Sequence, residues 1–240
     1  MSNVLKISSY YMLNSYQKNI LIIAAILILH IIVSVMVDTL VSPSRDAGGL
    51  VADLVLVWVF AISVSTFPSS YEYLLSQGIS RKKFFIGTVT SLAVISAAGS
   101  LMVMVYYGIS EQVIQTTGTL LIYEGLYHDP NLLRLVLWEF AALFMLGILG
   151  WLISLIYYMS GRIARIIVTV SPVVLWIVLI SLNRILDGVI SDGFRDFLKT
   201  VLGFTSSPSN PFTGAFSLFV FAIILCVPVF LLLRRCQVRN

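Results

Sequence analysis

The chain alternates between long apolar stretches and short polar connections. Six stretches reach the length of about 20 residues that a helix needs to cross a bilayer. They cover residues 19–37, 50–67, 86–107, 135–157, 163–182 and 212–233. None has the one-sided polar pattern of a water-soluble helix. The pattern therefore predicts an all-α membrane protein with six transmembrane helices.

Two connections carry amphipathic patterns of their own. Residues 1–18 are mostly polar, with an apolar side that includes Val4, Ile7 and Tyr11, which predicts an N-terminal helix in the cytoplasmic membrane interface. Residues 183–211 alternate apolar and charged positions at near-helical intervals. We expect one or two amphipathic helices there, packed on the outer face of the protein.

The connection between the second and third stretches contains helix start and stop signals. Pro68 and Ser69 favour a helix start, and Gly78 favours a helix stop. Ser80 can cap the helix that follows. The pattern predicts a short cytoplasmic helix held crosswise between two spans.

Composition agrees with a membrane protein and excludes other classes. Of the 240 residues, 59% are hydrophobic and only 11% are charged, whereas soluble domains carry about a quarter charged residues. A soluble enzyme and a disordered chain are both excluded on these figures. Two cysteines, Cys226 and Cys236, are too few for a disulfide scaffold or a four-ligand zinc site. We expect a single transmembrane domain over residues 1–240.

Basic and acidic residues divide between the two sides of the predicted membrane. With the N-terminus inside, ten of the fifteen basic residues and only one of the eleven acids, Glu72, fall on the inner side. This is the asymmetry that the positive-inside rule describes. It predicts a multi-pass protein of the cell membrane with both termini in the cytoplasm. The net charge of +4 reflects membrane topology and does not indicate nucleic-acid binding.

Residues for catalysis or metal binding do not converge in the sequence. The two histidines, His30 and His128, lie on different segments and do not form an HExxH-type zinc site. The run from Gly78 to Arg81 does not match the GxSxG pattern of a serine hydrolase. We therefore expect no catalytic residue and no metal site, and the chain is not predicted to be an enzyme.

Three ionisable residues lie within the predicted spans, where charges are costly and often functional. His30 is in the middle of the first span, Asp53 is near the outer end of the second, and Glu139 is about a turn inside the fourth. One interpretation is a proton or ion pathway. The other places both carboxylates at the outer interface, one of them near Arg134 or Arg45, and gives His30 an interhelical hydrogen bond.

Small residues recur four apart in the third stretch, as in Ser96 and Ser100. Such spacing allows helices to approach closely. Dense helix packing is the main interpretation, and a surface that lines a substrate path is the alternative.

The connection after the second span resembles a known family. Its Gly78-Ile79-Ser80-Arg81-Lys82 turn, followed by Phe84-Phe85, resembles the coupling region of permease subunits in type-2 ATP-binding-cassette (ABC) exporters. The similarity is greatest to the small six-span permeases of Gram-positive bacteria. The order of the predicted elements matches that family over nearly the whole chain. The resemblance makes residues 69–83 a coupling segment.

The resemblance implies a transport subunit that works with a separate ATPase. No segment has the phosphate-binding pattern GxxxxGKS/T, so ATP and Mg would be bound by another polypeptide and the chain itself has no nucleotide-binding domain or cofactor. Two permease subunits, identical or related, would face each other above two ABC ATPase subunits. The scarcity of charges favours an amphipathic or hydrophobic cargo, such as a peptide or a lipid-like molecule.

The resemblance also assigns residues to the contact with the ATPase. Tyr71, Leu74 and Leu75 would be apolar anchors in a groove of the ATPase, with Glu72 and Gln77 beside them. The turn itself supplies Gly78 and Arg81, although Arg81 and Lys82 are equally suited to contact lipid headgroups. Arg162 and Arg165 in the next cytoplasmic connection are a weaker contact candidate.

Three other functions remain as alternatives. A secondary transporter or channel would be favoured by a carboxylate near the membrane midplane or by an inverted repeat. A membrane scaffold or sensor would transport nothing. An intramembrane enzyme is the least favoured, because the polar groups do not converge.

The orientation can be tested by labelling introduced cysteines with a membrane-impermeant reagent. A cysteine near Asp192 is expected to react from outside intact cells, and a cysteine near Lys82 is expected to react only after permeabilisation. The opposite pattern would overturn the predicted orientation.

Overall fold

The computed structural model describes most of the second, third, fourth and sixth predicted spans. The described residues are 50–113, 122–127, 131–161 and 210–236, with scattered positions between 25 and 32 and between 193 and 203. The regular secondary structure of these residues is helical throughout, as the sequence pattern predicts.

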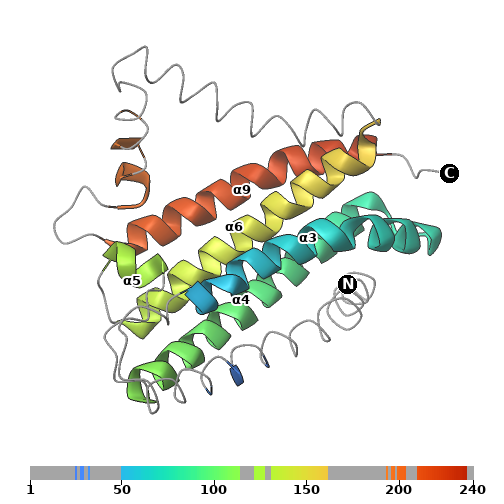
Figure 1. Cartoon of the computed structure of the whole chain (residues 1–240). Coiled ribbons are helices and arrows are strands. Elements are labelled where there is room, and N and C mark those ends of the chain that lie inside the picture. The colour runs from blue at the N-terminus through green and yellow to red at the C-terminus, as the bar shows by residue number, and fades with distance from the viewer. Residues whose placement is uncertain are drawn as a thin grey trace.

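Five helices are defined in the described ranges (Figure 1). They are α3 (Leu50–Ser76), α4 (Arg81–Val113), α5 (Ile122–Tyr127), α6 (Leu132–Met159) and α9 (Pro211–Arg235). Among the described residues, four helices are long and apolar enough to cross a membrane, namely α3, α4, α6 and α9. They match four of the six predicted spans. The predicted spans 19–37 and 163–182, the predicted helix 1–18 and most of 183–211 lie outside the described residues.

Helix α6 is the central element of this bundle. It packs against α3, α4 and α9, and Figure 1 shows it between α9 on one side and the α3–α4 pair on the other. Helices α3, α6 and α9 end at the same end of the bundle at which α4 begins. We call this the basic end, because Arg81, Lys82, Lys83, Arg234 and Arg235 are there. These residues were all predicted to lie on the inner side of the membrane.

Polar caps explain why α6 and α9 begin before their apolar stretches. The side-chain oxygen of Asn131 accepts hydrogen bonds from the backbone N–H of Leu133 at 3.0 Å and Arg134 at 3.4 Å. Asn210 caps α9 in the same way, accepting from the N–H of Phe212 at 3.0 Å. Each cap supplies an acceptor for an N–H group that the first turn of a helix leaves without a partner.

Glycines allow α6 to approach α3 closely. A Cβ atom added to Gly150 would lie 2.7 Å from the backbone oxygen of Phe60 and 3.1 Å from the Cβ of Ser63. A Cβ on Gly147 would lie 3.2 Å from Leu92 of α4. At Gly150 any side chain would meet the backbone of α3 and push the helices apart, whereas at Gly147 the end of the Leu92 side chain would have to shift by a few tenths of an ångström.

The small polar residues of α4 take part in helix packing, which confirms the main interpretation of their spacing. Ser91, Ser96 and Ser100 are all buried. The hydroxyl of Ser91 donates to the carbonyl of Gly87 at 2.8 Å, and that of Ser100 donates to the carbonyl of Ala97 at 2.9 Å. These bonds within the helix let hydroxyl groups be buried without a partner on another helix.

The crosswise helix predicted after Pro68 is not a separate element. Helix α3 continues through Pro68 to Ser76, and only four residues separate it from the start of α4 at Arg81. Proline removes one backbone donor from a helix. The hydroxyls of Ser65 and Thr66 both donate to the carbonyl of Ile62, at 3.1 and 2.9 Å, so side chains supply hydrogen bonds in the turn before it. The carbonyl that loses its donor to Pro68 is that of Val64, so these two bonds do not replace the missing one.

Two alanine substitutions test the close approach of α6 and α3. Gly150→Ala is expected to lower the free energy of unfolding by about 1–3 kcal/mol, because a rigid backbone oxygen occupies the space that its Cβ needs. Gly108→Ala in α4 is the control, since nothing lies within 4 Å of its added Cβ. It is expected to be neutral or slightly stabilising. Unfolding in detergent micelles measures both, and equal stability of the two variants would contradict this account.

Candidate functional site

The turn between α3 and α4 is a compact helix–helix connection. Gly78 has a φ of +75°, which is the left-handed conformation that favours glycine. The N–H of Gly78 donates to Leu75 O at 2.9 Å, and the N–H of Ile79 donates to Leu74 O at 3.2 Å. This pair of bonds is the Schellman motif that ends many helices. The predicted helix stop at Gly78 is confirmed.

Ser80 caps the start of α4, as the sequence predicts. Its carbonyl accepts from the N–H of Phe84 at 2.9 Å, and its hydroxyl accepts from the N–H of Lys83 at 3.5 Å. With a helix stop and a helix cap only two residues apart, the turn over residues 77–80 has little conformational freedom. A force applied to it passes directly into both helices.

Aromatic rings from three helices pack beneath this turn. Phe67 and Tyr71 of α3 stack with their ring centroids 5.2 Å apart. Tyr71 contacts Phe84 of α4 at 5.4 Å and Tyr158 of α6 at 5.8 Å, and Phe84 contacts Trp151 of α6 at 6.2 Å. Each such pair contributes about 0.5–1.5 kcal/mol beyond the burial of its area. The cluster therefore joins α3, α4 and α6 at the basic end.

Two hydrogen bonds join the turn to the end of α9. The hydroxyl of Tyr71 donates to the backbone oxygen of Cys236 at 3.1 Å, and Nη1 of Arg81 donates to the backbone oxygen of Arg234 at 2.6 Å. The last carbonyls of a helix have no partner within it and carry partial negative charge, so a guanidinium is a favourable donor. We call these four residues the turn–α9 contact.

Cys236 is buried within this contact. Its side chain is fully shielded from solvent, and desolvation raises the pKa of its thiol above the ordinary value, while the neighbouring Tyr71 and Arg81 lower it to a smaller extent. A thiol whose pKa is raised stays protonated at neutral pH and is a poor nucleophile. The residue therefore has a structural role in this conformation.

A further hydrogen bond joins the turn region to α6. The hydroxyl of Tyr158 donates to Oε1 of Glu72 at 2.9 Å. Glu72 itself is exposed, so its carboxylate is accessible from outside the bundle. The end of α3 is thus bonded to the ends of both α6 and α9.

Burial divides the predicted coupling residues into two groups. Tyr71 and Leu74 are 0% and 4% exposed, and they pack inside the chain. They are not accessible to a partner in this conformation, contrary to the prediction that they are anchors in its groove. Leu75 is half-buried, whereas Glu72 and Gln77 are exposed.

The remaining turn residues are consistent with this division. Gly78 is exposed, and Arg81 is half-buried because its guanidinium contacts the end of α9. Tyr73 is 47% exposed and was not among the predicted residues. The spacing of Phe67, Tyr71 and Leu74 could have indicated, from the sequence, which residues of this part of α3 are buried and which are exposed. These residues lie four and three apart on one helical face, which leaves Tyr73 on the other.

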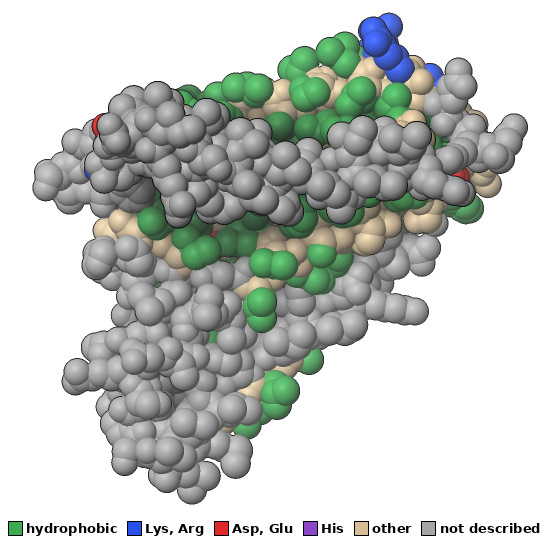
Figure 2. Space-filling view, turned by 45° about the horizontal axis from the view of Figure 1, so that its top comes forward, with side chains coloured by type: hydrophobic (Ala, Val, Ile, Leu, Met, Phe, Trp, Pro, Cys, Tyr) green, Lys and Arg blue, Asp and Glu red, His purple; other side chains and the backbone are tan. Residues whose placement is uncertain are grey.

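Exposed basic side chains surround the turn. Lys82, Lys83, Arg234 and Arg235 are all exposed. Figure 2 shows Lys and Arg side chains gathered at one end of the molecule, beside a hydrophobic surface. A group of cations at the end of apolar helices suits contact with anionic lipid headgroups.

Glu139, one of the predicted intramembrane residues, lies apart from this turn. Glu139 is 1% exposed and lies inside the bundle, on α6. It is about 10 Å from the centre of that helix, at 1.5 Å per residue. Asp53 belongs to α3, but its side chain is outside the described set, as are His30, Arg162 and Arg165 entirely. In the described part of the chain, no three His, Cys, Asp or Glu residues form a group suited to a metal ion.

The turn–α9 contact can be tested by removing its charged donor. Arg81→Gln is expected to lower the free energy of unfolding by about 1–2 kcal/mol, because the Arg234 carbonyl loses a charge-assisted hydrogen bond. The matched control is Lys82→Gln, which removes the same charge from an exposed neighbouring side chain. Thermal unfolding in micelles compares them. The contact would have no stabilising role if both variants unfolded at the same temperature as the unmodified protein.

Comparison with known proteins does not identify a family for this chain. No protein family model, no curated protein and no solved structure matches the chain.

Proposed function

We propose that the chain is the membrane-spanning permease subunit of an ATP-driven exporter of the type-2 ABC class. The observation that carries this proposal is the attachment of the α3–α4 turn to the rest of the bundle. Its backbone leads directly into two apolar helices, and its side chains bond to the ends of two more. A partner that moved this turn would move four helices together.

The exposed side of the turn is the proposed docking surface for the ATPase. Glu72, Tyr73 and Gln77 are exposed there, on the side of α3 opposite to the buried Tyr71 and Leu74. An exposed tyrosine among polar residues is typical of a residue that contributes strongly to a protein interface. The buried side transmits force into the bundle, and the exposed side receives it.

The remaining parts of the proposal come from the family resemblance. ATP and Mg bind to the ATPase subunits, and a second permease subunit, identical or related, completes the pathway in the cell membrane. The cargo is amphipathic or hydrophobic, such as a peptide or a lipid-like molecule. The four apolar helices support the membrane location.

A secondary transporter or channel is the second candidate, and Glu139 is the observation that favours it. A carboxylate buried within membrane helices is costly and often marks a pathway. However, Glu139 lies about 10 Å from the centre of α6, whereas proton-coupled transporters bind near the midplane. The position of Glu139 therefore gives this candidate less support than the turn gives the first.

Purification of the tagged chain, expressed together with the proteins encoded beside it, tests the proposal. We expect an ATPase to co-purify, and its ATP hydrolysis in proteoliposomes to depend on this chain. Tyr73→Ala and Gln77→Arg are each expected to reduce recovery of the ATPase about tenfold, as loss of an interface anchor does. Both positions are exposed, so the fold is retained.

Leu133→Ala is the matched control for these variants. Leu133 is 65% exposed and lies at the opposite end of α6 from the turn. It is expected to leave recovery of the ATPase unchanged. Absence of any ATPase from the purified protein, or equal recovery with all three variants, would refute the proposed docking surface.

A further inference from the structure

An open groove of about 710 Å³ lies between α3 and α6, near the basic end. Phe60, Val64 and Pro68 line it from α3, and Ile153, Tyr157 and Tyr158 line it from α6. Its volume falls within the range of about 300–1,000 Å³ that is typical of sites for small molecules. Its walls are mainly apolar, with hydroxyl groups among them.

Close packing beneath the groove positions its two walls. Gly150 brings α6 against the backbone of Phe60, and the Tyr158 ring is held by Phe67 and Tyr71 at centroid distances of 5.8 Å. Pro68 belongs to the α3 wall and has no N–H to donate to the carbonyl of Val64, which also lines the groove. Closely packed side chains therefore support the groove from beneath.

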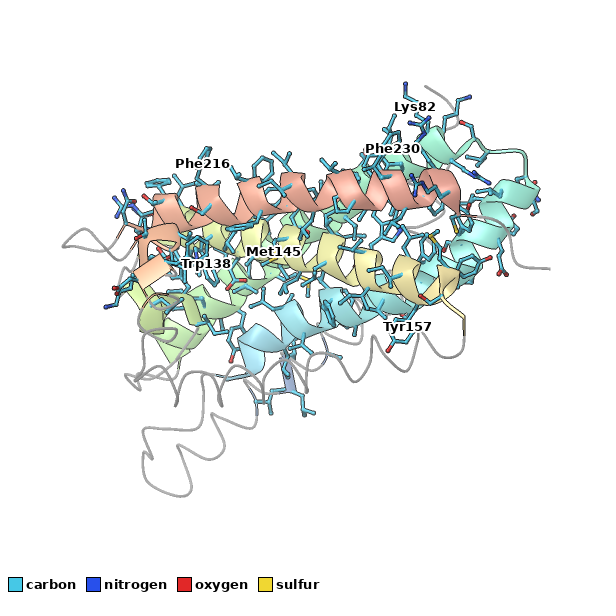
Figure 3. The ribbon with its side chains drawn as sticks, turned by 90° about the horizontal axis from the view of Figure 1, so that it is seen from above. Lys82, Trp138, Met145, Tyr157, Phe216 and Phe230 are labelled. Carbon is cyan, nitrogen blue, oxygen red and sulfur yellow. The ribbon has the colours of Figure 1, made fainter. Side chains whose placement is uncertain are left out.

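The charged group that is hydrogen-bonded to the wall of this groove is a carboxylate. No charged side chain is among the described residues that line it. Tyr158, which forms part of its wall, donates a hydrogen bond to the exposed carboxylate of Glu72. The exposed cation Lys82 lies at the same end of the helices, but on the opposite side of the bundle from Tyr157 (Figure 3). An apolar groove with a carboxylate beside it is complementary to an apolar molecule that carries a positive charge.

We propose that this groove binds a cationic amphiphile, with the apolar part between α3 and α6 and the positive group beside Glu72. Apolar walls favour the chain by removing it from water, and the carboxylate distinguishes a positive from a negative or neutral head. The binding itself needs no ATPase. Its further role as the site of exported cargo rests on the proposed function.

Photolabelling with a matched pair of probes tests the site. Both probes carry a photoreactive diazirine on a twelve-carbon chain, and one has a trimethylammonium head whereas the other has a neutral hydroxyl head. The purified protein in nanodiscs is labelled with each probe over a range of concentrations, and mass spectrometry locates the adducts. We expect saturable labelling of residues 60–68 and 153–158 by the cationic probe, at lower concentrations than by the neutral probe.

Three variants separate the charge, the groove and general effects on the helix. Glu72→Gln keeps an acceptor for Tyr158 but removes the charge, and it is expected to weaken labelling by the cationic probe about three- to fivefold. It should leave labelling by the neutral probe unchanged. Ser65→Phe fills the groove from an exposed position on its wall and is expected to abolish saturable labelling by both probes. Ala61→Phe adds the same ring to α3 at an exposed position outside the groove and is expected to change nothing.

The outcomes distinguish this site from the surrounding lipid and from the proposed function. Labelling that does not saturate, or that is as strong on the exposed Ile223 and Ile224 of α9, would show adventitious contact with the bilayer and refute the site. Equal labelling of the Glu72→Gln variant by the cationic probe would refute the role of charge. The photolabelling uses no ATPase, so its result does not depend on whether Tyr73→Ala reduces recovery of the ATPase. The proposed groove and the proposed docking surface can therefore each be refuted without the other.

Discussion

The contact between α6 and α3 at Gly150 is the constraint on which the rest of the described structure depends. Helix α6 makes the most extensive contacts with α3, α4 and α9, so its distance from α3 influences where the other helices can lie. A backbone oxygen of α3 occupies the space beside Gly150, and the next residue, Trp151, packs on Phe84 and Phe85 of α4 at 6.2 and 5.6 Å. The aromatic cluster beneath the turn can form only because the backbones approach closely at this point.

Sequence patterns predicted the features that local chemistry determines. The stop at Gly78 and the cap at Ser80 follow from backbone conformation and hydrogen bonding within a few residues, and both are present. The four described spans match their apolar stretches for the same reason, since a helix in lipid must satisfy its own backbone groups. The helix continuing through Pro68 was missed. Proline is a strong stop signal in water, but it is tolerated more readily within membrane helices.

The surface of the turn could not be predicted because burial depends on residues far away in sequence. Tyr71 and Leu74 resemble interface anchors when only their neighbours are considered. Tyr71 is buried because Tyr158 and Cys236, 87 and 165 positions further along the chain, pack or bond against it. The assignment of anchors thus required the positions of α6 and α9. Only the i, i+4, i+7 spacing of Phe67, Tyr71 and Leu74 could have indicated that α3 has a buried face at this level.

Helix α9 is packed much less than the other candidate spans in the described part of the chain. Only 17% of its most apolar window is buried, against 56% for α6, and phenylalanine and isoleucine side chains face outward along it. Its ends, in contrast, are fixed, by Arg134 over the ring of Phe212 at one end and by the turn–α9 contact at the other. At 25 residues it is about 37 Å long, which is enough to cross a bilayer core of about 30 Å. Any tilt of α9 within a bilayer would move Arg81 and Tyr71 with it, because both are hydrogen-bonded to its end.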